Sequence, residues 1–122
     1  MTYQDIANIV AEIGLSYAYY QFPVNEAPLL PYVVYFYPNR DDFVADNSNY
    51  GRVESCVIEL YTETKDLEQE RAVETVLDKY HLVYDKNESF INKENMYESY
   101  YEFEVFIDKY ETPTPPTPTP LQ

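Results

Sequence analysis

Residues 97 to 107 follow a two-residue alternation, and this pattern restricts the possible folds more than any other feature of the chain. One parity is mainly apolar and the other is mainly acidic. The two sets are Tyr97, Tyr101, Phe103, Val105 and Ile107, and Glu98, Glu102 and Glu104. Because successive side chains of a strand point to opposite faces, the pattern predicts a long strand with one buried face. Such strands are typical of an antiparallel sheet that is wetted on one side.

The stretch from residue 52 to residue 80 changes its period midway. "RVESCVIELYT" alternates like a strand. Its two faces are Cys56, Ile58 and Leu60, and Val57, Glu59 and Tyr61. Residues 66–80 then repeat like an amphipathic helix. The apolar stripe of this helix is Val73, Val76, Leu77 and Tyr80. Asp66 is placed to cap it, and Glu68 and Glu70, which we expect to be exposed, interact favourably with its N-terminus.

An earlier helix is predicted over residues 3–13. Thr2 is a suitable N-cap, Asp5 lies in the first turn, and Gly14 supplies a stop. The apolar face of this helix is Ile6, Ile9, Val10 and Ile13. The spacing indicates a short helix that packs on the core.

The remaining segments predict strands and loops. Aromatic and β-branched runs over 15–22 and 31–38 are bounded by proline and predict two strands. Two prolines in 23–30 predict that this segment is a loop between the two strands. The polar segment 39–51 predicts a second, longer loop. Residues 82–107 predict a strand, a turn and the long final strand.

The element order is therefore helix, three strands, helix, two strands. It predicts an α+β domain over residues 1–110, with an antiparallel or mixed sheet of about five strands and two helices packed on one face. The segment "TPTPPTPTPLQ" cannot join a sheet or a helix. We expect residues 111–122 to form an extended, polyproline-type tail, which is either solvated or a strip that binds a partner.

The charge and composition limit the class of protein. The 122 residues include 22 acidic and 8 basic side chains, for a net charge of −14. This charge repels nucleic acid and argues against a DNA-coating role. A hydrophobic content of 45% is too high for a disordered chain. Fifteen tyrosines and no tryptophan suit surfaces that are partly buried and partly wet.

No arrangement of residues points to a catalyst or a cofactor. Cys56 and His81 are each the sole residue of their type, which excludes an intrachain disulfide and a zinc set; we expect Cys56 to be a buried, unreactive thiol. The carboxylate pairs Glu68–Glu70 and Glu102–Glu104 lie on faces predicted to be solvated. The serines lack a nucleophile-elbow context, and two glycines cannot make a phosphate-binding loop.

One loop offers oxygen ligands for a metal. The residues concerned are Asp41, Asp42, Asp46 and Asn47. They lack the spacing, the central glycine and the terminal glutamate of a calcium loop, so a solvated loop is the favoured interpretation. The start, "MTYQDIANIV", has neither a basic region nor a long apolar run. We therefore expect no signal peptide, no membrane span and a cytoplasmic site of synthesis.

Three segments together resemble a known family. They are "LPYVVYFYP", "VIELYTETKDLEQERAVETVLD" and "KNESFINKENMYESYYEFEVF". Their order and texture, including the run Glu94, Met96, Tyr97 and Tyr101, resemble the small tail terminator (tail completion) proteins of long-tailed bacteriophages of Firmicutes. The resemblance covers residues 3 to 110.

The resemblance implies a structural virion protein without catalytic residues or cofactors. Such a protein forms a homohexameric ring at the head-proximal end of the tail, stops growth of the tail tube, and joins the tail to the head connector. Its partners would be itself, the tail-tube protein and the head-completion protein. DNA would pass through an acidic lumen without specific binding. The protein would assemble in the host cytoplasm and remain in the virion.

We hypothesise that the strand-to-helix junction and the outer face of the last strand meet a neighbouring subunit or the lumen. The candidate interface residues are Arg52, Glu59, Tyr61, Glu63, Lys65, Asp66, Arg71, Glu98, Glu102 and Glu104. The few cations among them would pair with a neighbour's carboxylates and guide register. Other interpretations stay open: a stopper or adaptor of the same connector, a small acidic inhibitor that mimics DNA, and, ranked last, an enzyme.

Overall fold

The structure, a computed structural model, describes residues 1–45 and 48–108, and for 39–45, 48–51 and 108 it describes the backbone. Its elements are α1 (Tyr3–Glu12), β1 (Ser16–Tyr19), β2 (Tyr32–Ala45), β3 (Ser48–Thr62), α2 (Leu67–Lys79), β4 (Tyr84–Ile91) and β5 (Met96–Asp108). This is the order that the sequence predicts. The predicted tail, 111–122, lies outside the described residues.

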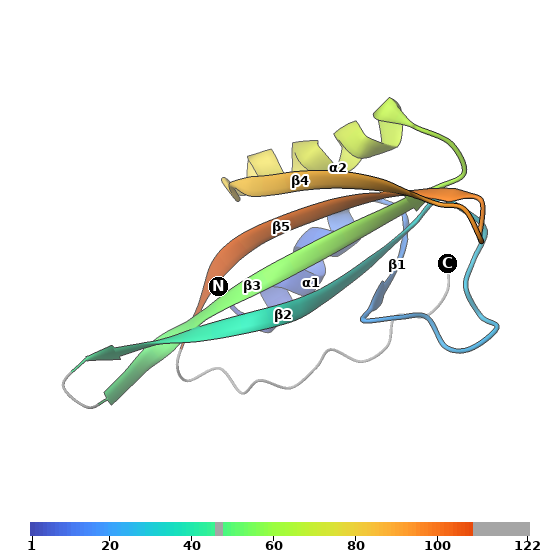
Figure 1. Cartoon of the computed structure of the whole chain (residues 1–122). Coiled ribbons are helices and arrows are strands. Elements are labelled where there is room, and N and C mark those ends of the chain that lie inside the picture. The colour runs from blue at the N-terminus through green and yellow to red at the C-terminus, as the bar shows by residue number, and fades with distance from the viewer. Residues whose placement is uncertain (46–47, 109–122) are drawn as a thin grey trace.

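The five strands form one mixed sheet in the order β1-β2-β3-β5-β4 (Figure 1). β1 runs parallel to β2, and the other neighbours are antiparallel. The two longest strands, β2 and β3, continue past β1 and, beyond the Gly51–Asp108 pair, past the end of β5, so the sheet narrows at one end to these two strands. The α+β class and the mixed sheet are confirmed.

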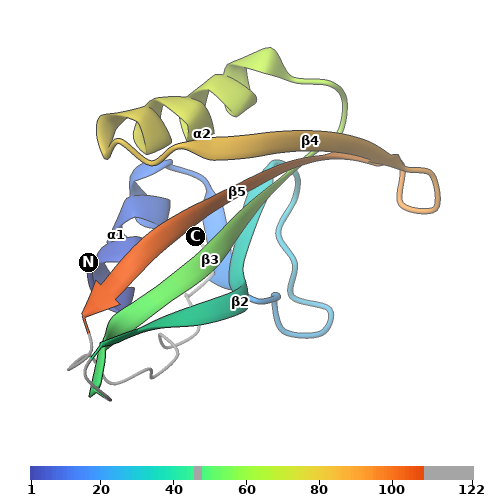
Figure 2. The same ribbon diagram turned by 60° about the vertical axis from the view of Figure 1, so that its left-hand side comes forward.

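Both helices pack on the same face of the sheet (Figures 1 and 2). The core between them is closed by fully buried side chains, among them Ile6 and Val10 of α1, Leu77 of α2, and Ile58 and Phe103 of the sheet. The alternation in β5 therefore works as predicted, because Tyr101, Phe103, Val105 and Ile107 are all buried against the helices. We call the opposite side of the sheet the outer face.

The helix ends follow from local chemistry. Thr2 and Asp5 form a reciprocal capping box at α1, with hydrogen bonds of 3.0 and 2.9 Å. Gly14 follows the helix with a φ of +88°, a conformation that residues with a Cβ rarely adopt. Asp66 caps α2 by accepting a 3.2 Å hydrogen bond from the backbone N–H of Gln69. Both helices thus begin at the predicted caps.

The prediction of a loop over 39–51 is wrong. β2 extends to Ala45 and β3 begins at Ser48, with antiparallel pairing from Asn39–Ser55 to Ala45–Ser48. The register shifts between Phe36 and Asn39, so Pro38 lies in a bulge that requires no N–H from it. The polar sequence of 39–51 has no apolar alternation, so the pattern does not report these strands. The metal candidates Asp41 and Asp42 lie in β2; their side chains, and Asp46 and Asn47 altogether, lie outside the described residues.

Candidate interaction surface

Three of the predicted interface residues meet on the outer face. Tyr61 of β3 lies opposite Glu98 of β5, and its hydroxyl donates a 3.2 Å hydrogen bond to Glu98 Oε2. Ser89 of β4 donates to the other oxygen of the same carboxyl at 3.1 Å. Glu59, two residues before Tyr61 on β3, shares a hydrogen bond with Glu98. The alternation predicted that Glu59 and Tyr61 share one face of their strand, and the register between β3 and β5 brings them to Glu98.

Glu59 and Glu98 form a carboxyl pair at this point. Partial burial, followed by the hydrogen bond and the negative charge of Glu98, raises the pKa of Glu59 from the usual 4.5 to about 8. Two carboxylates in contact cannot both ionise without strong repulsion, so the pair retains one proton near neutral pH. The same burial and the same two carboxyls raise the pKa of Tyr61, which keeps its hydroxyl as a donor. The outer face is therefore less negative than the composition indicates.

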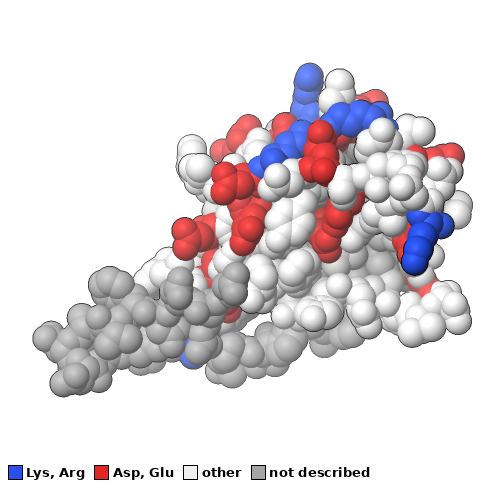
Figure 3. All heavy atoms as spheres, in the orientation of Figure 1, with Lys and Arg blue, Asp and Glu red and all other residues white. Residues whose placement is uncertain are grey.

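Glu102 and Glu104 lie further along the same face. Ser55 of β3 donates a 2.5 Å hydrogen bond to Glu102 Oε2, and Glu102 is partly buried. Glu104 is exposed. Acidic side chains are spread over this side of the molecule, and the lysines and arginines are few and lie mostly toward its edges (Figure 3). The outer face is thus acidic and partly wet, as predicted.

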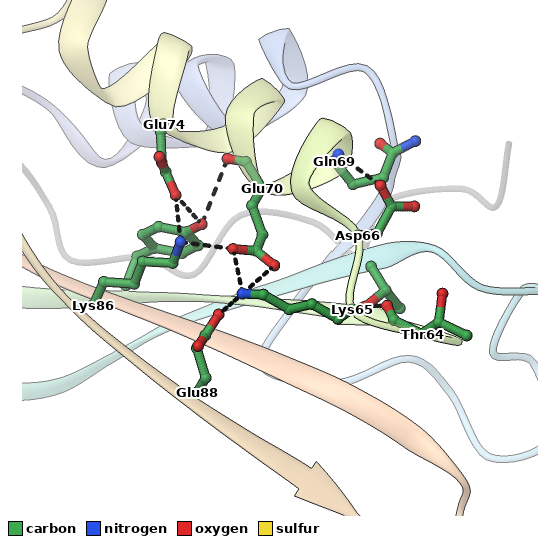
Figure 4. Close-up of polar contacts among 10 residues, drawn as sticks. Thr64, Lys65, Asp66, Gln69, Glu70, Glu74, Lys86 and Glu88 are labelled. Carbon is green, nitrogen blue, oxygen red and sulfur yellow. Dashed lines mark hydrogen bonds and ion pairs between the residues drawn. The ribbon is translucent and has the colours of Figure 1, made fainter.

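Lys65, in the junction between β3 and α2, lies on the other side of the sheet and belongs to a separate network of ion pairs (Figure 4). Lys65 Nζ lies 2.8 Å from Glu70 Oε2 and also pairs with Glu88 of β4. Lys86 of β4 pairs with Glu70 Oε1 at 2.6 Å and with Glu74 Oε2 at 2.8 Å. Lys65 is therefore paired within its own chain, and its charge serves the attachment of α2 to β4.

The expectation that Glu70 is exposed is wrong, since only 3% of the residue is accessible. Burial would raise its pKa, but hydrogen bonds from Lys65 and Lys86 together outweigh burial and lower it. A periodic pattern places Glu70 near the helix N-terminus but gives no information about two lysines that come from a loop and from a later strand. Those lysines make its burial possible.

The other predicted interface residues are dispersed. Asp66 is occupied as the cap of α2, and Arg71 on the same helix is exposed, with no ion pair among the described residues. Arg52 pairs in register with Ile107 and shares its helix-covered side of the sheet. Glu63 is exposed and borders a groove on the outer face. The ten residues therefore do not form one patch.

The loop between β1 and β2 was predicted from its two prolines, but its exposed apolar surface was missed. Tyr20, Val24 and Leu29 in this loop are 66%, 82% and 92% exposed. Phe22 is the exception, because it folds onto the outer face and packs edge to face on Tyr32, with ring centroids 5.1 Å apart. The signal was present in "PVNEAPLL", whose apolar residues lie in a predicted loop and in no predicted strand or helix.

The loop borders two adjoining hollows on the outer face. Their volumes are about 390 and 440 Å³, and both are lined by Ala27, Tyr32, Glu94 and Met96. The first also reaches Glu59 and Tyr61. Because they share these walls, we describe them as one feature, the outer groove. It joins aromatic rings, aliphatic side chains and the carboxyl pair.

Comparison with known proteins adds no relative: no family model matches the chain, and no curated protein matches it significantly. Neither described helix has the length and apolar content needed to cross a membrane. Within the described part of the chain, no three His, Cys, Asp or Glu side chains converge in a way that could hold a metal ion.

Proposed function

We propose that this chain is a structural protein that assembles with copies of itself, and specifically a tail terminator that forms a ring at the head-proximal end of a phage tail. The observation that carries the proposal is the exposed apolar loop beside the outer groove. Leu29, which is 92% exposed, lines the groove beside Tyr32, and Val24 of the same loop is 82% exposed. Exposed apolar groups beside such a groove mark an interaction site. Tyrosine, abundant here, is enriched at such interfaces.

A ring of identical subunits requires two different surfaces that fit each other. The outer face supplies an acidic, tyrosine-rich surface. The opposite side supplies the exposed cation Arg71 on α2, which is able to pair with a neighbour's carboxylates. The segments that resemble tail terminators contribute to both sides. An acidic inner surface would also keep passing DNA from adhering.

The test is to change the loop and measure assembly. Leu29→Glu alters a side chain that is 92% exposed, so the fold should be unaffected while self-association is lost. Val83→Glu is the matched control, since Val83 is 89% exposed and lies in the connection between α2 and β4. Light scattering coupled to size exclusion, with and without tail-tube protein, gives the mass. Electron microscopy gives the length of tubes grown with each variant.

The expected result is a six-subunit ring and tubes of limited length for the unaltered chain and for Val83→Glu. Leu29→Glu should give monomers and tubes that continue to grow. A chain that stays monomeric even with tube ends present would refute the proposal. An oligomer that leaves tube length unaffected would refute the terminator function and favour another connector ring, such as a stopper or adaptor.

A second candidate is an acidic inhibitor that mimics DNA, which the carboxylates of the outer face favour (Figure 3). The proton retained by the Glu59–Glu98 pair weakens this candidate, because it removes charge from the middle of that face. A monomer that binds a basic nucleic-acid enzyme would support the inhibitor. The mass measurement therefore separates the two candidates.

A further inference from the structure

The outer groove has walls suited to a particular kind of segment. Tyr20, Phe22, Tyr32 and Tyr61 line one of its two hollows, and Tyr32 lies 5.3 Å from Tyr61 between ring centroids. Aromatic walls of this kind recognise polyproline helices, whose proline rings pack flat against them.

Carboxyl groups around the outer groove restrict which segments can bind there. Glu59, Glu63 and Glu94 lie around the groove, and the chain as a whole carries a charge of −14. An acidic segment of another copy would be repelled. An uncharged segment approaches without this cost.

Residues 112–122 meet both requirements. "TPTPPTPTPLQ" contains no charged residue and is rich in proline. It includes the spacing P-x-x-P at Pro113 and Pro116, which aromatic grooves recognise in extended ligands.

The length of the chain indicates which copy supplies the segment. Glu98 faces Tyr61 at the groove, and β5 continues from there to Asp108, about 33 Å away at roughly 3.3 Å per residue. The segment contains a second, overlapping P-x-x-P unit at Pro115 and Pro118. In the polyproline form, at about 3.1 Å per residue, Pro116 lies within about 25 Å of Asp108 and Pro118 within about 31 Å. Neither unit therefore reaches the Tyr32–Tyr61 pair of its own chain. The segment of a neighbouring copy is not limited by this distance.

We propose that the outer groove binds the Pro/Thr-rich segment of a neighbouring copy, with Pro113–Pro116 against the tyrosine rings. This contact rests on the self-association proposed above, and it identifies the segment of the neighbouring copy that the groove binds. In a ring each subunit then gives one segment and receives one, so the contact closes with the ring.

The experiment places a photo-reactive residue in the full chain, as Thr117→p-benzoylphenylalanine, which leaves Pro113 and Pro116 unchanged. Unlabelled and ¹⁵N-labelled chains are mixed, irradiated and digested, and the cross-linked peptides are identified by mass spectrometry. The expected result is pairs of mixed isotope that join the segment to peptides carrying Tyr20–Tyr32 or Glu94–Met96. The same residue at Val83 is the control and should not give these pairs. Leu29→Glu, which places a charge at the groove, should lose most of them.

Three outcomes overturn the inference. Pairs of a single isotope would place the segment on its own chain, and mixed pairs elsewhere would place it on another surface. An oligomer by light scattering without groove pairs would refute this contact and leave self-association intact. Groove pairs together with tubes of unlimited length would instead retain the contact and refute the terminator function.

Discussion

Lys86 Nζ lies 2.6 Å from Glu70 Oε1, and this ion pair attaches β4 to the first turn of α2. Glu70 receives Lys65 as well, so one buried carboxylate joins a strand, a helix and the junction between β3 and α2 (Figure 4). Tyr101 of β5 adds a fourth element through a 2.8 Å hydrogen bond to Glu74, the second partner of Lys86. The strand-to-helix junction is charged because it organises this network.

Glu70→Gln should therefore lower the free energy of unfolding by about 1–3 kcal/mol, the usual cost of removing a charged hydrogen-bonding partner. The lower part of this range is expected because both lysines are partly exposed and retain Glu74 and Glu88. Glu68→Gln is the control, since Glu68 is exposed in the same helical turn and feels the same helix N-terminus. Urea unfolding measures both. Equal losses would show that the network contributes nothing beyond the helix terminus.

The raised pKa of Glu59 predicts how the free energy of unfolding depends on pH. The unfolded chain releases this proton near pH 4.5, whereas the folded chain retains it until about pH 8. The folded state therefore binds more protons in this interval, and the free energy of unfolding falls as the pH rises through it. Glu59→Gln cannot ionise and should remove this part of the slope, which makes the variant comparatively more stable at pH 8 than at pH 5. Urea midpoints across the range provide the measurement, with Glu104→Gln, an exposed side chain of the same face, as control. A slope unaffected by Glu59→Gln would contradict the carboxyl pair.

Glu70 acts in the opposite direction and in another interval. Because its folded pKa is lowered, its contribution is present above pH 4.5 and is lost as the pH falls through the lower folded value. The two carboxyl groups are therefore separable by pH as well as by mutation.

Cys56 should not react with thiol reagents in the native protein. Its side chain is fully buried against Phe103, and burial raises the pKa of the thiol, so thiolate is scarce. The rate of labelling should follow the rate of unfolding, and it should therefore increase with the urea concentration. Rapid labelling without denaturant would show that the sheet opens locally at its centre.

The burial of Cys56 and the buried side of β5 were predicted from a two-residue alternation, and both helices were predicted from a 3.6-residue period. A period reports these features directly because they depend on neighbours in sequence. The strands over 39–51 have a polar sequence without apolar alternation, and the burial of Glu70 and the outer groove depend on partners far away in the chain. The lysines that neutralise Glu70 are five residues before it and sixteen after it, on separate elements. A periodic pattern in α2 carries no record of either.

Deleting residues 112–122 should change the free energy of unfolding by no more than about 0.5 kcal/mol, the scale of surface changes. The segment contains Leu121 as its sole apolar residue besides proline, and it contains none of the residues that the sequence pattern assigns to the core. Urea unfolding at low protein concentration, where the chain is monomeric, makes this measurement. A large loss would show that the segment packs on its own domain.

Reversing the charge of the two cations near the junction, Lys65 and Arg71, should have different effects on the stability of the monomer. Lys65→Glu places a carboxylate against Glu70 and Glu88, so it should destabilise the monomer. Arg71→Glu changes an exposed side chain and should leave the free energy of unfolding within about 0.5 kcal/mol. If Arg71 faces a neighbour's carboxylates, its reversal should weaken each subunit contact by about two- to fivefold, the range of exposed ion pairs. Urea unfolding and the concentration dependence of ring mass provide the two measurements. Unaltered assembly of Arg71→Glu would remove α2 from the interface, while the outer groove would remain to be tested by Leu29→Glu.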